Sequence, residues 1–400
     1  MKNYFELNEM TVIEYVVSKI DFFAMDAEFE CNEIGDGNLN LVFRVNDIKN
    51  KKSIIVKQAL PYVRAAGEDW PLDINRGEIE TKVLKIEYEL TGGLVPEVYN
   101  FDGEMFCMIM EDLSSYIIMR YGLLDVIQYP NFANQISDFL VKTLLLTSDV
   151  VMDHQKKKDN VKQFINPELC DITEALVYEE PFHIGARNDI EEKLIDFHEE
   201  FIVGDGELKR EVAKLKFDFM NNGQALLHGD LHTGSIFINQ ESTKVIDPEF
   251  AFYGPMAYDI GAVIANLIMN YISTKARVKA GEKQDRHLEF LRVSIKDTID
   301  MFVNKSLDLW NEVVTDKMAK SEGFKEWYIR DVLVNTAGVT GCEMIRRTVG
   351  FAHVKDLDII PNEDTRIEAK KVNLKLAVEL IKNRDDIVTG DDYLNLINKI

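Results

Sequence analysis

The segment LLHGDLHTGSIFIN, residues 226–239, most restricts the folds that are open to this chain. Gly229 and Gly234 interrupt it, so we expect a loop rather than a helix before the apolar run SIFI. A second β run, TKVI, follows a polar turn and leads directly into Asp247. The segment therefore predicts a lone hairpin with acidic residues, inside a stretch whose periodicity is otherwise helical.

The first third of the chain has a different pattern. LNLVFRV and SIIVKQAL predict two short strands, and the polar run NDIKNKK between them predicts a turn. CMIMEDL predicts a third strand. RGEIETKVLKIEYEL, which lies between SIIVKQAL and CMIMEDL, predicts one helix. From about residue 130 the pattern is helical, except that HQKKKDN is expected to be a solvated, mobile loop. The helix predicted from RGEIETKVLKIEYEL would place four apolar residues near one face: Ile79, Val83, Leu84 and Ile86.

This order of elements predicts an α+β, bilobed protein. A small β-rich lobe would span residues 1–113, and a larger, mainly helical lobe would span residues 114–400.

The charge balance limits the partners. The net charge of −23 argues against binding to nucleic-acid backbones or anionic membranes, and solubility is its main alternative meaning. The N-terminus lacks the features of a signal peptide, and the uncharged run from Ile260 to Thr274 is too short to span a bilayer. We expect that run to be a buried helix. The four cysteines lie far apart, which favours reduced thiols in a cytoplasmic protein.

A lysine of the β-rich region could bind phosphate with a glutamate as its partner. Lys57 lies within an apolar strand, and Glu80 lies 23 residues later on the predicted helix. One kinase fold holds the α and β phosphates with such a pair. The alternatives are a lysine on an edge strand and a glutamate on a solvated helical face. Gly35 and Gly37 permit a phosphate-facing turn, although an ordinary hairpin turn has the same composition.

The histidine-rich segment allows two interpretations. His228 and His232 have zinc-ligand spacing for a helix, but Gly229 and Gly234 break that helix and disfavour a zinc site. As a loop, the segment presents Asp230, and Asp247 and Glu249 follow in IDPE. Phosphoryl transfer needs one aspartate to accept a proton and further carboxylates to hold magnesium. The alternative for Asp230 is a residue that caps a helix or a turn.

The ordered set GDGNLN, Lys57, Glu80, MED, HGDLH and IDPE resembles the protein-kinase-like fold, in its branch of aminoglycoside and choline phosphotransferases. That branch carries asparagine where this chain has Ser235, and aspartate where it has Glu249. Both departures, with GEDWPL, NPELCDITE, VIDPEFAFYGP and GCEMIRRTVGFAHV, are similar to the 5-methylthioribose kinases of methionine salvage. The resemblance covers about residues 33 to 356.

The resemblance implies an ATP site in the first lobe. Lys57 would contact the phosphates and be steadied by Glu80, while backbone groups from Met110 onward would hold adenine. Asp247 and Glu249 would bind Mg²⁺, and Ser235 leaves a second metal in doubt because a hydroxyl is a weak ligand. The further nucleotide contacts would be Gly35, Gly37, Asn40, Glu111, Asp112 and Leu113.

The resemblance also implies a sugar site and a homodimer. Asp230 would be the catalytic base, and Arg346 and Arg347 would contact 5-methylthioribose during its phosphorylation at the 1-hydroxyl. From the residues alone, the arginines favour exposed ion pairs on a helix. Two other functions stay open: a kinase for choline, homoserine or an aminoglycoside, and a non-catalytic kinase-like module.

Overall fold

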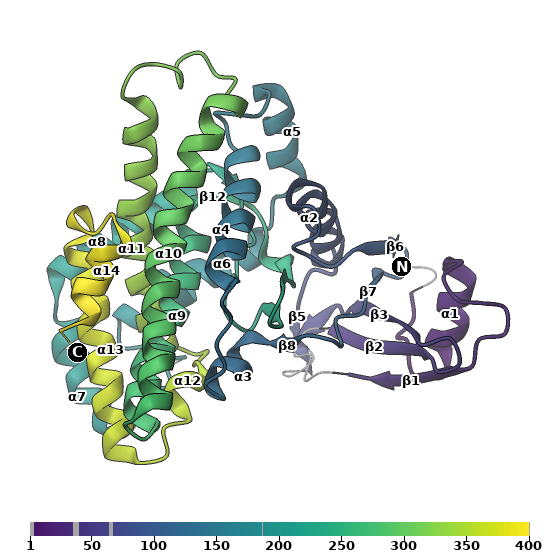
Figure 1. Cartoon of the computed structure of the whole chain (residues 1–400), viewed down its shortest axis with the longest axis horizontal. Coiled ribbons are helices and arrows are strands. Elements are labelled where there is room, and N and C mark those ends of the chain that lie inside the picture. The colour runs from purple at the N-terminus through teal and green to yellow at the C-terminus, as the bar shows by residue number, and fades with distance from the viewer. Residues whose placement is uncertain (1–3, 35–39, 64–66, 186, 400) are drawn as a thin grey trace. The chain divides into compact units, whose positions relative to one another are not determined.

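The computed structural model describes residues 4–34, 40–63, 67–185 and 187–399 (Figure 1). The chain divides into two compact units. The first comprises Met1–Tyr116 and Lys244–Ala251, and the second comprises Ile117–Thr243 and Phe252–Ile400. The predicted hairpin therefore contributes its acidic end, with Asp247, to the first unit.

The first unit is built on a five-stranded antiparallel sheet in the order β1-β2-β3-β7-β6. The three predicted strands and the predicted helix are confirmed. The elements of this unit are β1 (Phe29–Glu33), β2 (Asn40–Asp47), β3 (Lys52–Ala59), β6 (Val98–Asp102), β7 (Cys107–Glu111), the short pair β4 (Tyr62–Val63) and β5 (Gly67–Pro71), the single-turn η5 (Pro248–Phe250), and helices α1 (Thr11–Lys19) and α2 (Arg76–Thr91).

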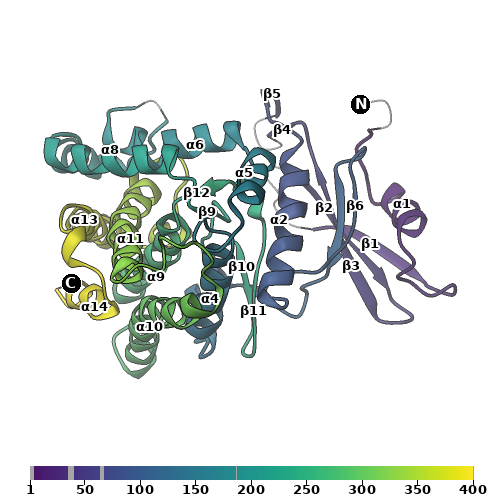
Figure 2. The same cartoon turned by 90° about the horizontal axis from the view of Figure 1, so that it is seen from above.

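The alternation of side chains along β3 decides which way Lys57 points. Ile54 and Val56 belong to the core that includes Val12 and Val16 of α1. Because successive residues of a strand face opposite sides of the sheet, Lys57 is directed to the other face, where α2 packs (Figure 2).

Lys57 lies in the middle of the sheet. Its strand is flanked by β2 and β7, where Val42 and Met108 stand opposite it. The edge-strand alternative for this lysine is therefore wrong. A lysine on a central strand cannot extend sideways into water, so it needs partners on the face of the sheet.

The second unit is mainly helical. Helix α9 packs against α10, α11 and α13, and α9, α10 and α11 run side by side (Figure 1). The helices of this unit are α3 (Met119–Leu124), α4 (Phe132–Leu140), α5 (His154–Gln163), α6 (Pro167–Tyr178), α7 (Ile195–His198), α8 (Gly206–Asn221), α9 (Ala257–Arg277), α10 (Glu282–Val313), α11 (Phe324–Val349), α12 (Lys355–Asp358), α13 (Glu363–Lys382) and α14 (Gly390–Ile397).

Helix α9 is the centre of this unit. Every residue from Ala257 to Thr274 is buried, which confirms the predicted buried helix. Among the residues that the structure describes, no helix is both long and apolar enough to cross a membrane. The four cysteines are free thiols, with Cys107 and Cys342 buried.

The predicted turn between β10 (Ile236–Ile238) and β11 (Thr243–Val245) is confirmed, and the Asn239 N–H donates to the Ser242 carbonyl at 3.0 Å. The other short strands of this unit are β8 (Ile117–Ile118), β9 (Ala225–Leu226) and β12 (Tyr253–Gly254).

The prediction of a mobile loop at HQKKKDN is wrong, because these residues begin helix α5. Asp153 caps the helix by accepting hydrogen bonds from the N–H groups of Gln155 and Lys156 at 3.1 and 2.9 Å. Lys157 is buried, and its ammonium contacts Asp149 and backbone carbonyls, including that of Gln224 at 3.2 Å. One capping carboxylate and one buried lysine thus order a charged run that composition alone describes as solvated.

Candidate active site

The first unit brings Lys57 and Glu80 together as predicted. The Lys57 Nζ lies 2.8 Å from Glu80 Oε1 and 2.6 Å from Asp247 Oδ1. Glu80 is only 2% exposed, so its alternative position on a solvated helical face is wrong. The sheet supplies the lysine, α2 supplies the glutamate, and the segment after β11 supplies the aspartate.

Negative charge is in excess around Lys57. Although burial lowers the pKa of Lys57, the carboxylates of Asp247 and Glu80 raise it overall, so the ammonium stays charged. Burial, together with the carboxylates of Asp247 and Glu249, raises the pKa of Glu80 to about 7 against the opposing effect of Lys57. Three carboxylates thus face only two cations, Lys57 and Arg76, an arrangement that favours an added cation.

Asp247 has an unusual backbone. Its φ of 63° and ψ of 48° place it in the left-handed region, immediately before Pro248. An aspartate tolerates this region better than most residues, but the conformation is still strained. Its side chain remains 43% exposed, so one part of the carboxylate is open while Oδ1 contacts Lys57.

Arg76, which the sequence analysis missed, organises two of the predicted residues. It is 2% exposed, and its NH2 donates to Asn40 Oδ1 at 3.0 Å while its Nε lies 3.3 Å from Glu249 Oε2. The Asn40 Nδ2 donates to the same Glu249 oxygen at 3.3 Å. An arginine at the start of an amphipathic helix normally reaches solvent, so no sequence signal identified this one.

The acidic side chains after β7 are engaged within the first unit. Glu111 lies 3.0 Å from Lys244 Nζ, and Asp112 accepts a 2.6 Å hydrogen bond from Ser53 Oγ. Leu113 is buried. Adenine binding by backbone groups here stays a prediction. The predicted contacts at Gly35 and Gly37 lie outside the described residues.

Asp247 and Glu249 fit a magnesium ion better than zinc. Within the described part of the chain, no three His, Cys, Asp or Glu side chains are grouped so that they could hold a metal by themselves. Magnesium is commonly bound by one or two protein carboxylates together with substrate phosphates and water, so this pair is sufficient for it. The local excess of carboxylates supports the same assignment.

In the second unit, the backbone around Asp230 is fixed by a buried carboxylate. Asp259, on the first turn of α9, accepts hydrogen bonds from the N–H groups of His228 at 2.7 Å and Gly229 at 3.0 Å. Gly229 has a φ of 85°, which a side chain would strain. Ser235 Oγ donates to the Asp230 carbonyl at 3.0 Å, so this hydroxyl closes the loop.

Arg346 and Arg347 converge on Asp230. The NH2 group of each arginine lies 3.3 Å from the same oxygen, Asp230 Oδ1. Their side chains are only 11% and 7% exposed, so the alternative of exposed surface ion pairs is wrong. Burial raises the pKa of Asp230, but His232 and these two arginines lower it overall, to well below the usual range of an aspartate.

A second missed residue, Glu343, holds both arginines. It is 2% exposed; it accepts a hydrogen bond from Arg347 Nε at 2.8 Å and contacts Arg346 Nε. Its position three and four residues before the arginines on one helix was the signal that could have identified it.

His232, also on this loop, has a defined tautomer. Its Nδ1 accepts hydrogen bonds from the backbone N–H groups of Gly234 and Ser235, both at 3.0 Å. The ring proton is therefore on Nε2, which lies 3.4 Å from Asp230 Oδ2. Burial lowers the pKa of His232 to about 3, so the ring is neutral and directs an N–H toward the aspartate.

Comparison with known proteins agrees with this geometry. Residues 168–292 match the phosphotransferase enzyme family. The methylthioribose kinase of Geobacillus sp. (strain WCH70) is 43% identical over 393 residues, which cover 98% of this chain and 96% of that protein. The chain belongs to the methylthioribose kinase family. The methylthioribose kinase of Bacillus pumilus (strain SAFR-032) is 41% identical, with 99% and 98% of the two chains covered.

The fold is supported by a solved structure. A choline kinase from Cryptosporidium parvum superposes with a TM-score of 0.52 at 17% identity, over 95% of this chain and 97% of that one. This confirms the kinase-like α+β fold that the order of motifs predicts.

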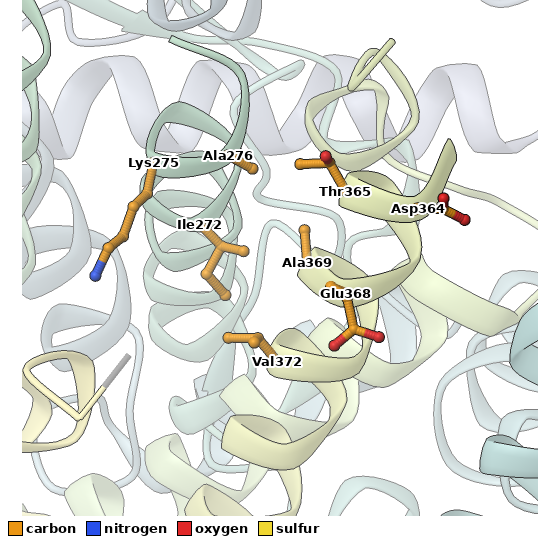
Figure 3. A pocket seen from close by; sticks show the side chains of 8 residues that line it. All are labelled: Ile272, Lys275, Ala276, Asp364, Thr365, Glu368, Ala369 and Val372. Carbon is orange, nitrogen blue, oxygen red and sulfur yellow. The ribbon is translucent and has the colours of Figure 1, made fainter. Parts of the chain in front are cut away.

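The pocket shown in Figure 3 is separate from the residues around Asp230 in this methylthioribose kinase family member. It has a volume of about 460 Å³ and lies between the end of α9 and the start of α13. Ile272 and Ala276 face Ala369 and Val372 across it, whereas Lys275 points away. None of the predicted site residues lines this pocket.

Proposed function

We propose that this protein transfers the γ-phosphoryl group of ATP to the 1-hydroxyl of 5-methylthioribose, giving the 1-phosphate and ADP, as a step of methionine salvage. The convergence of Arg346 and Arg347 on Asp230 carries the proposal, because it joins a proton acceptor to two buried cations. Family membership supplies the identity of the sugar.

Residues of the first unit would bind ATP. Lys57, held by Glu80, would contact the phosphates, and backbone groups after β7 would contact adenine. Asp247 and Glu249 would hold Mg²⁺, which neutralises phosphate charge when it is bound.

Residues of the second unit would bind the sugar. Asp230 orients the 1-hydroxyl and accepts its proton. The hydroxyl oxygen forms a bond to the γ-phosphorus, while the bond from that phosphorus to the bridging oxygen breaks and its electron pair leaves with ADP. Because such transfer depends mainly on positioning and charge stabilisation, a weakly basic aspartate is sufficient. The arginines would stabilise the charge that develops on the transferred group.

The alternatives are less well supported. A cationic aminoglycoside or choline would meet two buried guanidinium groups beside the proton acceptor, which disfavours it. A non-catalytic module is disfavoured because Lys57, Asp230 and Asp247 are all present and all engaged in charged contacts. The homodimer and the cytoplasmic location stay predictions that rest on family resemblance.

The test is a phosphate-transfer screen with ATP and magnesium over 5-methylthioribose, choline, homoserine and an aminoglycoside. We expect ADP release and a new sugar 1-phosphate signal in ³¹P NMR with 5-methylthioribose alone. The matched control is Asp230→Asn, which keeps the shape and should lose about 100-fold or more in turnover while it still binds ATP. Equal turnover of another alcohol, or an active Asp230→Asn variant, would contradict the proposal.

A further inference from the structure

A third arginine, Arg120, approaches the loop that carries Asp230. It occupies the first turn of α3, and its backbone N–H donates to the Thr233 carbonyl at 3.0 Å. A Cβ atom at Gly234 would lie 3.1 Å from the Arg120 NH1 and 2.7 Å from the His232 Cε1. A side chain at this position would therefore crowd the guanidinium, whereas glycine does not. The Arg120 side chain is 17% exposed.

The charge of this guanidinium is poorly matched by its surroundings. Its NH2 donates to Asn266 Oδ1 at 3.5 Å, which is at the limit of a hydrogen bond, and its buried Nε has no hydrogen-bond partner among the described residues. The carboxylate oxygen Asp356 Oδ2 lies 3.9 Å from that Nε and likewise has no hydrogen-bond partner in the part of the chain that the structure describes. Burial, together with the neighbouring Arg347, lowers the pKa of Arg120.

The other arginines of this region have better partners. Arg346 and Arg347 share Glu343 and Asp230, as described above. Arg277 donates to the Leu124 carbonyl at 2.6 Å and to Ser273 Oγ at 3.2 Å. Arg120 therefore differs from them in having a buried N–H donor, at Nε, that has no acceptor among the described residues. A buried donor without an acceptor is costly, so its retention indicates a ligand that supplies one.

We propose that Arg120 is a third cation of the acceptor site, which binds the phosphoryl group that the sugar carries after transfer. This inference rests on the proposed function. A sugar hydroxyl would supply one neutral acceptor, whereas a phosphate monoester supplies several charged oxygens that match the planar fork of a guanidinium. Arg346 and Arg347 share Glu343 and Asp230 as partners, whereas Arg120 has no carboxylate within hydrogen-bond distance in the described part of the chain, so its charge is the one that a product phosphate would complete.

The test compares binding of 5-methylthioribose with binding of its 1-phosphate. The Arg120→Met and Arg120→Lys variants are measured for the KM of the sugar, for the inhibition constant of the sugar 1-phosphate, and for thermal unfolding. The control is Arg277→Met, which removes a half-buried arginine of the same unit that has its own hydrogen bonds.

We expect Arg120→Met to weaken binding of the sugar 1-phosphate by about 10- to 100-fold, measured as its inhibition constant, with a much smaller change in the KM of the sugar. Arg120→Lys should lose less, because it keeps the charge but not the fork. Arg277→Met should lower the unfolding temperature and leave the ratio of the two affinities unchanged. If Arg120→Met does not fold, the affinity ratio of Arg120→Lys decides.

An unchanged ratio in the folded Arg120 variants would overturn the inference and leave the proposed function intact. A wild-type protein that neither phosphorylates 5-methylthioribose nor binds its 1-phosphate would instead overturn the proposed function, and this inference with it.

Discussion

The carboxylate of Glu343 accepts a hydrogen bond from Arg347 Nε at 2.8 Å, one helical turn away on α11. The same carboxylate contacts Arg346, and the outer NH2 groups of both arginines then reach Asp230 Oδ1. Glu343 thus orients two cations toward Asp230, the proton acceptor that we propose, and we expect it to act as a positioning residue.

Replacing Glu343 with glutamine should therefore impair use of the sugar. The amide keeps the size but weakens the charged hydrogen bonds to the arginines, so kcat/KM for 5-methylthioribose should fall about 10-fold or more, while the KM for ATP changes little. Steady-state kinetics with each substrate varied in turn measures this. The control is Glu191→Gln, which weakens an ion pair with Arg366 on α13 and should leave kcat/KM unchanged. An equal loss in both variants would indicate a merely structural effect.

The two arginines can be tested separately from their glutamate. Arg346→Ala and Arg347→Ala should each lower kcat/KM for the sugar by about 10- to 100-fold, because each removes a charged contact. Arg346→Lys and Arg347→Lys should recover only part of this loss, since lysine lacks the planar fork. Wild-type values of kcat/KM for the sugar in the alanine variants would remove both arginines from the site.

The pH dependence of kcat/KM should report the low pKa of Asp230. In the wild type Asp230 is expected to titrate below the usual aspartate pKa of about 3.9, so this residue stays ionised through mildly acidic pH and its acid limb lies below that range. Without Arg346 and Arg347, burial is less opposed and the pKa of Asp230 rises, so the acid limb of the double alanine variant should move to higher pH. Identical acid limbs in the two proteins would contradict this electrostatic coupling.

Lys57 should stabilise the first unit as well as bind phosphate. Lys57→Met leaves Glu80 and Asp247 facing each other without their cation, and the loss of a buried partner costs about 3 kcal/mol or more in unfolding free energy. Adding Glu80→Gln should recover part of this loss, because one carboxylate is then neutral. Denaturant unfolding of the single and double variants measures both effects. A double variant less stable than Lys57→Met would show that charge repulsion is not the cause.

His353 should make stability depend on pH. Its Nδ1 lies 3.3 Å from Asp358 Oδ2 and its Nε2 lies 2.6 Å from the Asp189 carbonyl, so the doubly protonated ring can donate to both. The hydrogen bond to Asp358 raises the pKa of His353, against the opposing effects of burial and Lys370. The stabilisation is therefore fully present below the unfolded pKa of about 6.5 and is lost as pH rises through the folded pKa.

The matched variant is His353→Gln. Its unfolding free energy should fall below that of the wild type at about pH 5.5 and approach it at about pH 8.5, across the titration of histidine. A difference that stays constant between these two pH values would show that the histidine does not titrate in this contact.

Local pattern was sufficient for the order of elements and for the residues most directly linked to chemistry. Short β-rich runs predicted the strands around Lys57, helical periodicity predicted α2, and a long uncharged run predicted the buried helix α9. The spacing of Asp230, Asp247 and Glu249 after short β runs pointed to phosphoryl transfer, because that chemistry requires those groups in a fixed order.

Only the tertiary structure decided which charged side chains are buried and what they contact. Arg76 and Arg120 resemble surface residues of amphipathic helices, but their side chains contact partners far away in the sequence, such as Glu249 and Asp356. The run around Lys157 was predicted as a loop for the same reason: its partners at Gly223 and Gln224 lie more than 60 residues away. A sequence pattern records the polarity of each position, but burial of a charge depends on the partner that the fold brings to it.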